Sequence, residues 1–272
     1  MNMKRIIFVL CFVFCIWPIT TFGAIDYAQI DKYAKEAPWL KNNSNLDRLV
    51  KYLVQPYKKD VEKARVLLAW IVYNIDYDGY KLNAMEDAMK TSGKHNRQLF
   101  IPNNDILETR LGVCGDIATL YQKMGEIAGL TVSLITGRVR QEGEDVADFD
   151  VGPGHVWTAV KIDGLWQFVD PTFAIDGTST IVMGDVDRKR QYERNIKQRT
   201  KRNASTKKPR EGRVVDNRWF LINKHELIKT HFPDNERWQL LEKPLSKQEF
   251  LGLSDRQYRN LQRQVQKGNR RN

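Results

Sequence analysis

A two-residue turn at Asp163–Gly164 joins two largely apolar segments, residues 155–162 and 165–172. Asp-Gly between two such segments favours a β-hairpin, and the short turn fixes the register of both strands. In that register His155 and Asp170 are diagonal neighbours on one face of the sheet, roughly 7–8 Å apart at the backbone and within reach of each other's side chains. A slip of one residue would separate them, so the hairpin constrains both the fold and the chemistry.

Cys114 follows a Gly-containing turn in the segment RLGVCGD at residues 110–116. Apolar residues then recur at helical spacing over residues 117–127, and Gly129 ends the predicted helix. A cysteine at the start of a helix has its sulfur near the positive end of the helix dipole, where the thiolate is favoured. This position predicts a nucleophile. The alternative is a buried free cysteine that packs as a small apolar residue.

Other periodic segments predict the remaining elements of the domain. We interpret His225 and His231 as structural histidines and His95 as a surface histidine. Trp70 and Tyr73 flank an apolar stripe and are expected to pack in the core. Strands are predicted at residues 130–138 and 219–222, and helices at residues 46–53, from a cap at Asp60 to Ile75, and at 225–233, the last ending in a Pro-capped turn.

The N-terminus has the pattern of a signal peptide over residues 1–24. Lys4 and Arg5 precede an apolar stretch at residues 6–16, and small residues follow near Gly23. An apolar stretch of about 11 residues is too short for a helix that crosses a bilayer, which needs about 20. We therefore expect a secreted or periplasmic protein whose only remaining cysteine is Cys114, and a retained anchor is the alternative.

The net charge of +11 is concentrated in two segments. Residues 188–213 hold 12 Lys and Arg against 2 Glu, and residues 254–272 hold 6 Lys and Arg against 1 Asp, which leaves −4 for the rest of the chain. We predict one domain over residues 25–253, with a basic insertion at about 177–218 and a basic tail at 254–272. An anionic cell-envelope surface is the expected partner of these segments. Nucleic acid is not expected, because aromatic residues do not interleave with the basic runs.

Cysteine, histidine and aspartate in this order predict nucleophilic catalysis by a thiol. The thiolate of Cys114 would attack an amide or ester carbonyl, and His155 would first pair with the thiolate and later protonate the leaving group. Asp170 would hold the far nitrogen of the imidazole and support its charged form. The backbone N–H of Cys114 is the expected first donor to the oxyanion.

The three motifs RLGVCGD, GHVWTAV at residues 154–160 and WQFVDPT at residues 166–172 together resemble the core signature of the transglutaminase-like superfamily. The resemblance covers about Val61 to Phe173. Three later segments resemble, more loosely, the branch of kyphoscoliosis peptidases and cytokinesis proteins. These segments are WFLI at residues 219–222, THFP at 230–233 and WQLL at 238–241.

The resemblance implies a papain-like α+β fold, in which the helix that bears the nucleophile packs on an antiparallel β-sheet. It also implies acyl transfer from an amide to water or an amine through a thioester, with Cys114, His155 and Asp170 as catalytic residues and no cofactor. The insertion at about 177–218 is not part of the core pattern. No metal site is expected, because the acidic segment at residues 141–150 lacks the spacing of a calcium loop.

The sequence therefore favours an exported cysteine peptidase or amidase that acts on protein or peptide substrates. One alternative is a protein-glutamine γ-glutamyltransferase that cross-links proteins, which needs a site that admits an amine and excludes water. The other is a catalytically silent binding or scaffolding protein of the envelope, in which the basic segments are the functional parts.

Overall fold

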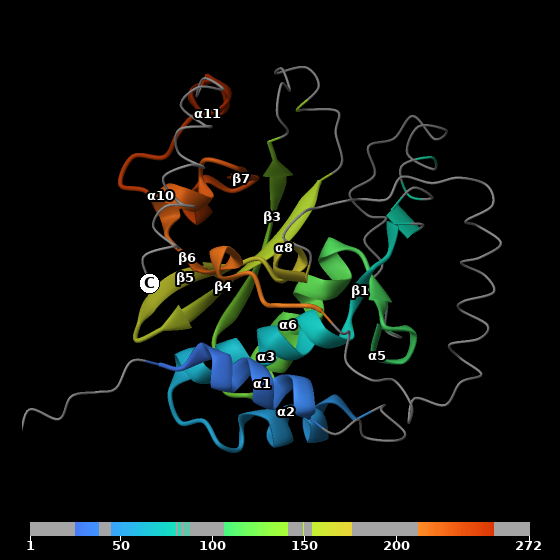
Figure 1. Cartoon of the computed structure of the whole chain (residues 1–272). Coiled ribbons are helices and arrows are strands. Elements are labelled where there is room, and N and C mark those ends of the chain that lie inside the picture. The colour runs from blue at the N-terminus through green and yellow to red at the C-terminus, as the bar shows by residue number, and fades with distance from the viewer. Residues whose placement is uncertain are drawn as a thin grey trace, which may run out of the picture.

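The predicted hairpin lies at the centre of a five-stranded antiparallel sheet (Figure 1). The strands lie in the order β6–β5–β4–β3–β7, with bounds β3 Val132–Val139, β4 His155–Ile162, β5 Leu165–Val169, β6 Phe220–Ile222 and β7 His231–Pro233. The structure, a computed structural model, describes residues 25–37, 45–79, 81–82, 85, 87, 106–140, 149, 154–175 and 212–252. The predicted signal peptide, residues 177–211 of the predicted insertion and the tail at 254–272 lie outside these ranges, as does His95.

The register of the hairpin is the one that its turn predicts. Ile162 pairs with Leu165 and Thr158 with Val169. The second strand is shorter than predicted, because β5 ends at Val169 and the chain enters a short helix, α8 (Pro171–Ile175). Proline lacks the N–H that a strand needs and has the backbone angle of a first helical residue, which explains the change of direction.

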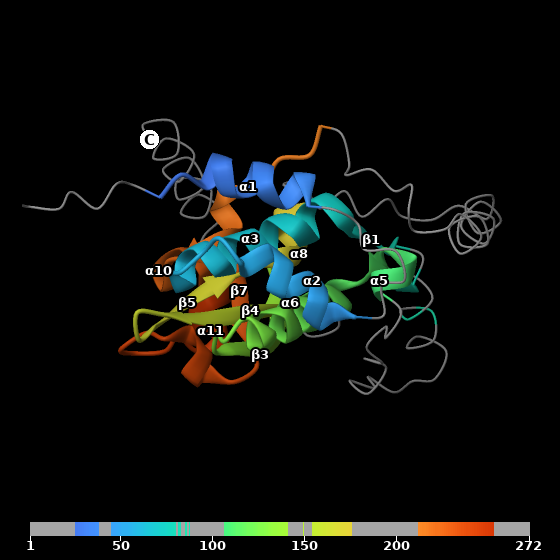
Figure 2. The same cartoon turned by 90° about the horizontal axis from the view of Figure 1, so that it is seen from below.

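Helices lie on both sides of the sheet, and together with the sheet they confirm the predicted α+β class. Figure 2 shows α1 and α3 on one side of strands β4 and β5 and α11 on the other. Among the described residues, no helix has both the length and the apolar character that crossing a membrane requires. Besides α8, the helices in the described part of the chain are α1 Tyr27–Glu36, α2 Leu46–Val54, α3 Asp60–Asn74, α5 Ile106–Thr109, α6 Cys114–Ile127, α10 Lys224–Leu227 and α11 Lys247–Leu251, with 3₁₀ turns η3 Asn217–Trp219 and η4 Glu236–Gln239.

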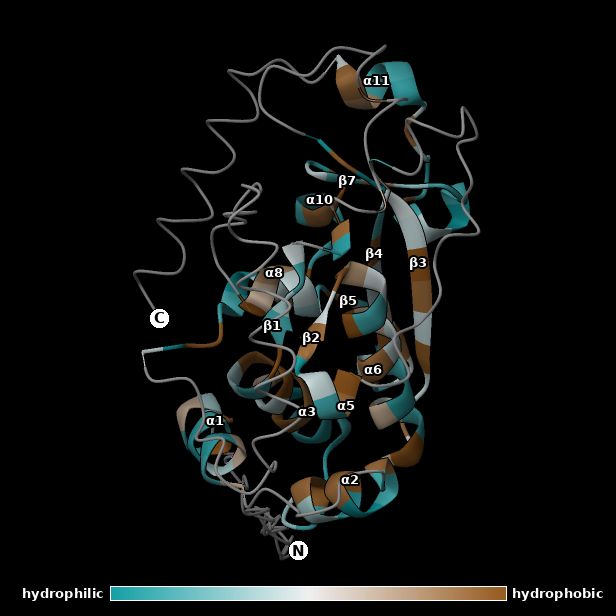
Figure 3. Ribbon diagram, turned by 90° about the vertical axis from the view of Figure 1, so that its right-hand side faces the viewer, coloured by the Kyte–Doolittle hydropathy of each residue, from teal (hydrophilic) through white to brown (hydrophobic). Residues whose placement is uncertain are grey.

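Apolar side chains fill both sides of the sheet. On one side, Val160 and Ile162 of β4 join the cluster formed by α3 and α6, which also includes Trp70. On the other, Trp157 and Ala159 of the same strand join the cluster next to α10 and η4. This alternation is the period-two pattern of a strand covered on both faces. Figure 3 shows hydrophobic residues along both α6 and β3, which contact each other.

The edge strand β7 corrects one prediction. The sequence predicts a helix with a Pro-capped turn over residues 225–233, whereas the helix α10 ends at Leu227 and His231–Pro233 forms a strand that pairs with β3. The approach of β7 depends on Gly137 of β3, because a Cβ atom there would lie 2.2 Å from the carbonyl oxygen of Phe232 and 2.6 Å from Trp157. Only glycine lets the edge strand come this close.

Candidate active site

Cys114 is the first residue of α6 and is held by a tightly packed turn. The turn runs through the two-residue strand β2 (Leu111–Gly112), which pairs in parallel with β1 (Asp76–Tyr77). A Cβ atom at Gly112 would lie 2.8 Å from Ile106 and 2.9 Å from the Cβ of Asp116, so a larger residue would displace the turn. Cys114 forms no disulfide, and the residue is 5% exposed. Its position at the start of a helix is the one predicted to favour an anion.

Asp116 stabilises this turn from inside. Its Oδ2 accepts hydrogen bonds from the backbone N–H of Val113 at 3.0 Å and from Nζ of Lys81 at 2.7 Å. The carboxylate side chain is fully buried. The ammonium group of Lys81 therefore compensates the negative charge of this buried carboxylate.

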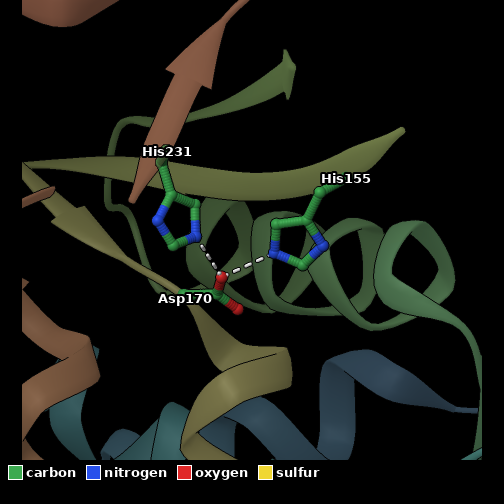
Figure 4. A group of neighbouring side chains, drawn as sticks. All are labelled: His155, Asp170 and His231. Carbon is green, nitrogen blue, oxygen red and sulfur yellow. Dashed lines mark hydrogen bonds and ion pairs between the residues drawn. The ribbon is translucent and has the colours of Figure 1, made fainter. Parts of the chain in front are cut away.

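His155 and Asp170 form a buried ion pair. His155 is the first residue of β4, and its Nε2 lies 2.6 Å from Oδ2 of Asp170 (Figure 4). Nδ1 is therefore the ring nitrogen left for the thiol of Cys114, which contributes to the raised pKa of His155. The structure thus joins His155 to Asp170, and the role of Cys114 as their nucleophile stays a prediction.

Asp170 is fixed by the helix that follows it. Its Oδ1 accepts from the backbone N–H groups of Thr172 at 2.9 Å and Phe173 at 3.0 Å. This is the geometry of an N-cap residue, with Pro171 at the first helical position. The cap leaves Oδ2 as the oxygen that contacts the imidazoles, so the local fold of α8 orients the carboxylate.

The electrostatic environment favours a charged pair. Burial alone would lower the pKa of His155, but the charge and the hydrogen bond of Asp170, with smaller contributions from Cys114, raise it to about 10. Burial would raise the pKa of Asp170, yet the two neighbouring imidazoles outweigh burial and hold it well below its usual range. At neutral pH the pair is therefore an imidazolium and a carboxylate.

His231 of β7 is a site residue that the sequence analysis missed. Its Nε2 lies 3.1 Å from the same Oδ2 of Asp170, and its Nδ1 lies 2.7 Å from the hydroxyl of Thr230. The side chain is fully buried, whereas that of His225, with which it was grouped, is exposed. No local pattern in the sequence marks this role, because His231 reaches the site through the pairing of β7 with β3.

Aromatic rings enclose the two imidazoles. The ring of His155 stacks on Phe173 with centroids 5.0 Å apart and on Trp157 at 5.9 Å. His231 has Trp157 at 5.0 Å and Trp219 at 5.7 Å. These contacts exclude water from the ion pair, which strengthens its electrostatic interaction.

Two histidines and an aspartate are also a donor set that zinc uses. Four ligand atoms at about 2.0–2.1 Å from a tetrahedral ion lie roughly 3.3 Å from one another. Oδ2 of Asp170 and Nε2 of His155 lie only 2.6 Å apart, which is a hydrogen-bond distance. The three side chains thus fit a hydrogen-bonded network better than a shared ion.

The chain is similar to several known proteins. Residues 47–171 match the transglutaminase-like superfamily. The chain is 28% identical over 232 residues to human kyphoscoliosis peptidase and 25% identical over 238 residues to hillarin of Drosophila melanogaster. Each match covers 84% of this chain, but only 29% of the length of kyphoscoliosis peptidase and 25% of the length of hillarin. A crystal structure of a TGase has 14% identity and a TM-score of 0.35, covering 64% of this chain and 39% of that one.

Proposed function

Because the chain carries a transglutaminase-like superfamily domain over residues 47–171, we propose that it is a thiol hydrolase that cleaves amide bonds in proteins or peptides. The observation that carries the proposal is the buried pair of His155 and Asp170 at 2.6 Å, with Cys114 at the start of α6 contributing to the raised pKa of His155. The chain spans less than a third of the length of the curated relatives that it matches. The human relative is named a peptidase.

In the first half of the proposed reaction, the thiolate of Cys114 attacks the amide carbonyl. The oxyanion that forms accepts a hydrogen bond from the backbone N–H of Cys114. The imidazolium of His155 then gives the proton on Nδ1 to the leaving amine, so the C–N bond breaks and a thioester forms. Asp170 keeps the proton on Nε2 throughout and supports the charged ring.

In the second half, the neutral imidazole of His155 takes a proton from water, which attacks the thioester. The C–S bond breaks, the acid is released, and the thiolate–imidazolium pair is restored. A primary amine in place of water would give a new amide, which is the cross-linking alternative. Water is the default acceptor, because nothing in the described residues selects an amine over it.

Ammonia release from a glutamine-containing peptide tests the proposal, with a primary amine present or absent. The hydrolase releases ammonia without the amine, and the product peptide contains glutamate. Cys114→Ala should abolish the release, whereas Ser133→Ala, on the partly buried β3, serves as the control. Release that requires the amine and yields the amine adduct would instead establish the cross-linking reaction, and no release from any peptide amide would contradict both.

Export and an anionic envelope surface are the remaining parts of the proposal, supported by the apolar N-terminal stretch and the two basic segments. Deletion of residues 188–211 should weaken sedimentation with phosphatidylglycerol vesicles in a salt-sensitive way. It should leave peptide hydrolysis intact. Loss of hydrolysis together with binding would contradict this division of roles.

A further inference from the structure

His231 contacts the carboxylate that the proposed mechanism uses, but that mechanism assigns it no part. Both imidazoles approach one oxygen, Oδ2 of Asp170, from β4 and from β7 (Figure 4). All three side chains are buried. A hydrogen bond from His231 to this oxygen affects the position and the charge of the carboxylate that supports His155.

The hydrogen atoms of this network follow from what each group can donate. An ionised carboxylate only accepts, so Nε2 of His231 must carry a hydrogen to bond with Oδ2 of Asp170. If the ring is neutral, its Nδ1 is an acceptor, and the hydroxyl of Thr230 at 2.7 Å donates to it. The alternative acceptor for this hydroxyl, the carbonyl oxygen of Leu227, is farther away at 3.2 Å.

The neutral form of His231 also agrees with its surroundings. Burial lowers its pKa, and although Asp170 raises it, the nearby charge of His155 adds to the lowering. Asp170 and His155 are the ionised groups that face the ring, and its other described neighbours are the hydroxyl of Thr230 and aromatic rings. The imidazole of His155 is therefore charged, whereas that of His231 is neutral.

We propose that His231 is a positioning residue, a neutral imidazole that Thr230 holds in the Nε2–H tautomer so that it donates to Asp170 and fixes the carboxylate against His155. The inference rests on the proposed function, because it concerns the same thiol and imidazole. With backbone donors on Oδ1 and two imidazoles on Oδ2, the carboxylate is stabilised as an anion by every contact described for it.

Loss of the His231 donor should make Asp170 easier to protonate. A protonated Asp170 cannot support the imidazolium of His155, so the thiolate would be lost at a higher pH than in the wild type. A hydrogen bond to a charged group corresponds to a change of about 10- to 100-fold. The acid limb of thiol reactivity therefore reports on His231 without any substrate.

The test is the rate of Cys114 alkylation by iodoacetamide between pH 4 and 9, followed by mass spectrometry on the peptide that contains Cys114. His231→Leu should move the acid limb about one unit to higher pH, so that alkylation at a pH on that limb is about tenfold slower than in the wild type. His231→Gln, which keeps an N–H donor, should recover most of the rate. His225→Leu, on the exposed side of α10, is the matched control.

Thr230 provides a second test in case the His231 variants do not fold. Thr230→Val removes the hydroxyl with little change of shape and should shift the acid limb in the same direction, and Thr230→Ser should rescue the loss. An acid limb that coincides with the wild type in His231→Leu and in Thr230→Val would overturn the inference. A wild-type thiol that is inert at pH 6 would overturn the proposed function and this inference with it.

Discussion

Replacement of Asp170 by asparagine probes the ion pair most directly. The substitution keeps the volume of the side chain and an oxygen that can cap α8, but it removes the charge that supports the imidazolium of His155. Burial would then act on His155 with little opposition and lower its pKa from about 10 to below the ordinary value of 6.5. The thiol of Cys114 would lose its cationic partner at neutral pH.

The size of the effect follows from the ionisation of an unsupported thiol. A cysteine with the ordinary pKa of about 8.5 is thiolate to well under about 1% at pH 6. A thiol kept as an ion pair is largely ionised at that pH. Asp170→Asn should therefore slow alkylation of Cys114 at pH 6 on the order of 100-fold and leave the rate above pH 9 nearly unchanged.

Iodoacetamide alkylation as a function of pH measures this change. Asp163→Asn is the matched control, because Asp163 is exposed, has a φ of 49° in the hairpin turn, and asparagine suits that backbone. The control should have the wild-type profile. If Asp170→Asn reacted at pH 6 as fast as the wild type, Asp170 would not support the imidazolium, and the reasoning would fail.

The same ion pair predicts how stability depends on pH. The pKa of His155 is higher in the folded protein than the unfolded value of 6.5, so its contribution is complete below pH 6.5 and is lost as the pH rises through about 10. The rise in the pKa of His155 corresponds to at most about 5 kcal/mol in the free energy of unfolding. In urea unfolding, the free energy of unfolding should fall more between pH 6.5 and pH 10 in the wild type than in Asp170→Asn. Equal losses would contradict the prediction.

Two substitutions away from the ion pair test the packing. Gly137→Ala should destabilise the protein by about 2 kcal/mol or more, because its Cβ would overlap the backbone of β7, whereas Gly154→Ala meets only an oxygen at 3.6 Å and should be tolerated in urea unfolding. Asp31→Asn should lower the free energy of unfolding by about 3–5 kcal/mol in the same assay, since it leaves the buried guanidinium of Arg65 without the carboxylate at 2.6 Å. Glu36→Gln, in an exposed pair with Lys32, is the control and should lower it by less than about 1 kcal/mol.

The parts of the structure that short-range signals specify were predictable from the sequence. The turn at Asp163–Gly164 fixed the register that brings His155 to Asp170, and apolar periodicity identified α3 and α6. One signal was present but was misinterpreted. Aspartate followed by proline marks an N-cap and a first helical residue, whereas the apolar pattern of residues 165–172 predicts a strand that includes both.

The role of His231 could not be predicted in this way. Its strand has three residues and pairs with β3, so its place depends on contacts between segments far apart in the chain. The close approach at Gly137 that allows this pairing is also a long-range property. A short apolar segment with a proline at its end is compatible with several local structures, and tertiary contacts decide among them.

Arg213 joins the end of the predicted insertion to the domain. Its guanidinium donates to the carbonyl oxygens of Val72 and Ile75 at 2.9 and 2.6 Å and to Oδ1 of Asp76 at 2.7 Å. The end of α3 and the start of β1 thus serve as a docking point where the chain returns after residues 176–211. A truncation meant to remove only the basic residues must stop before Gly212, because one that includes Arg213 would also detach the segment that leads into β6.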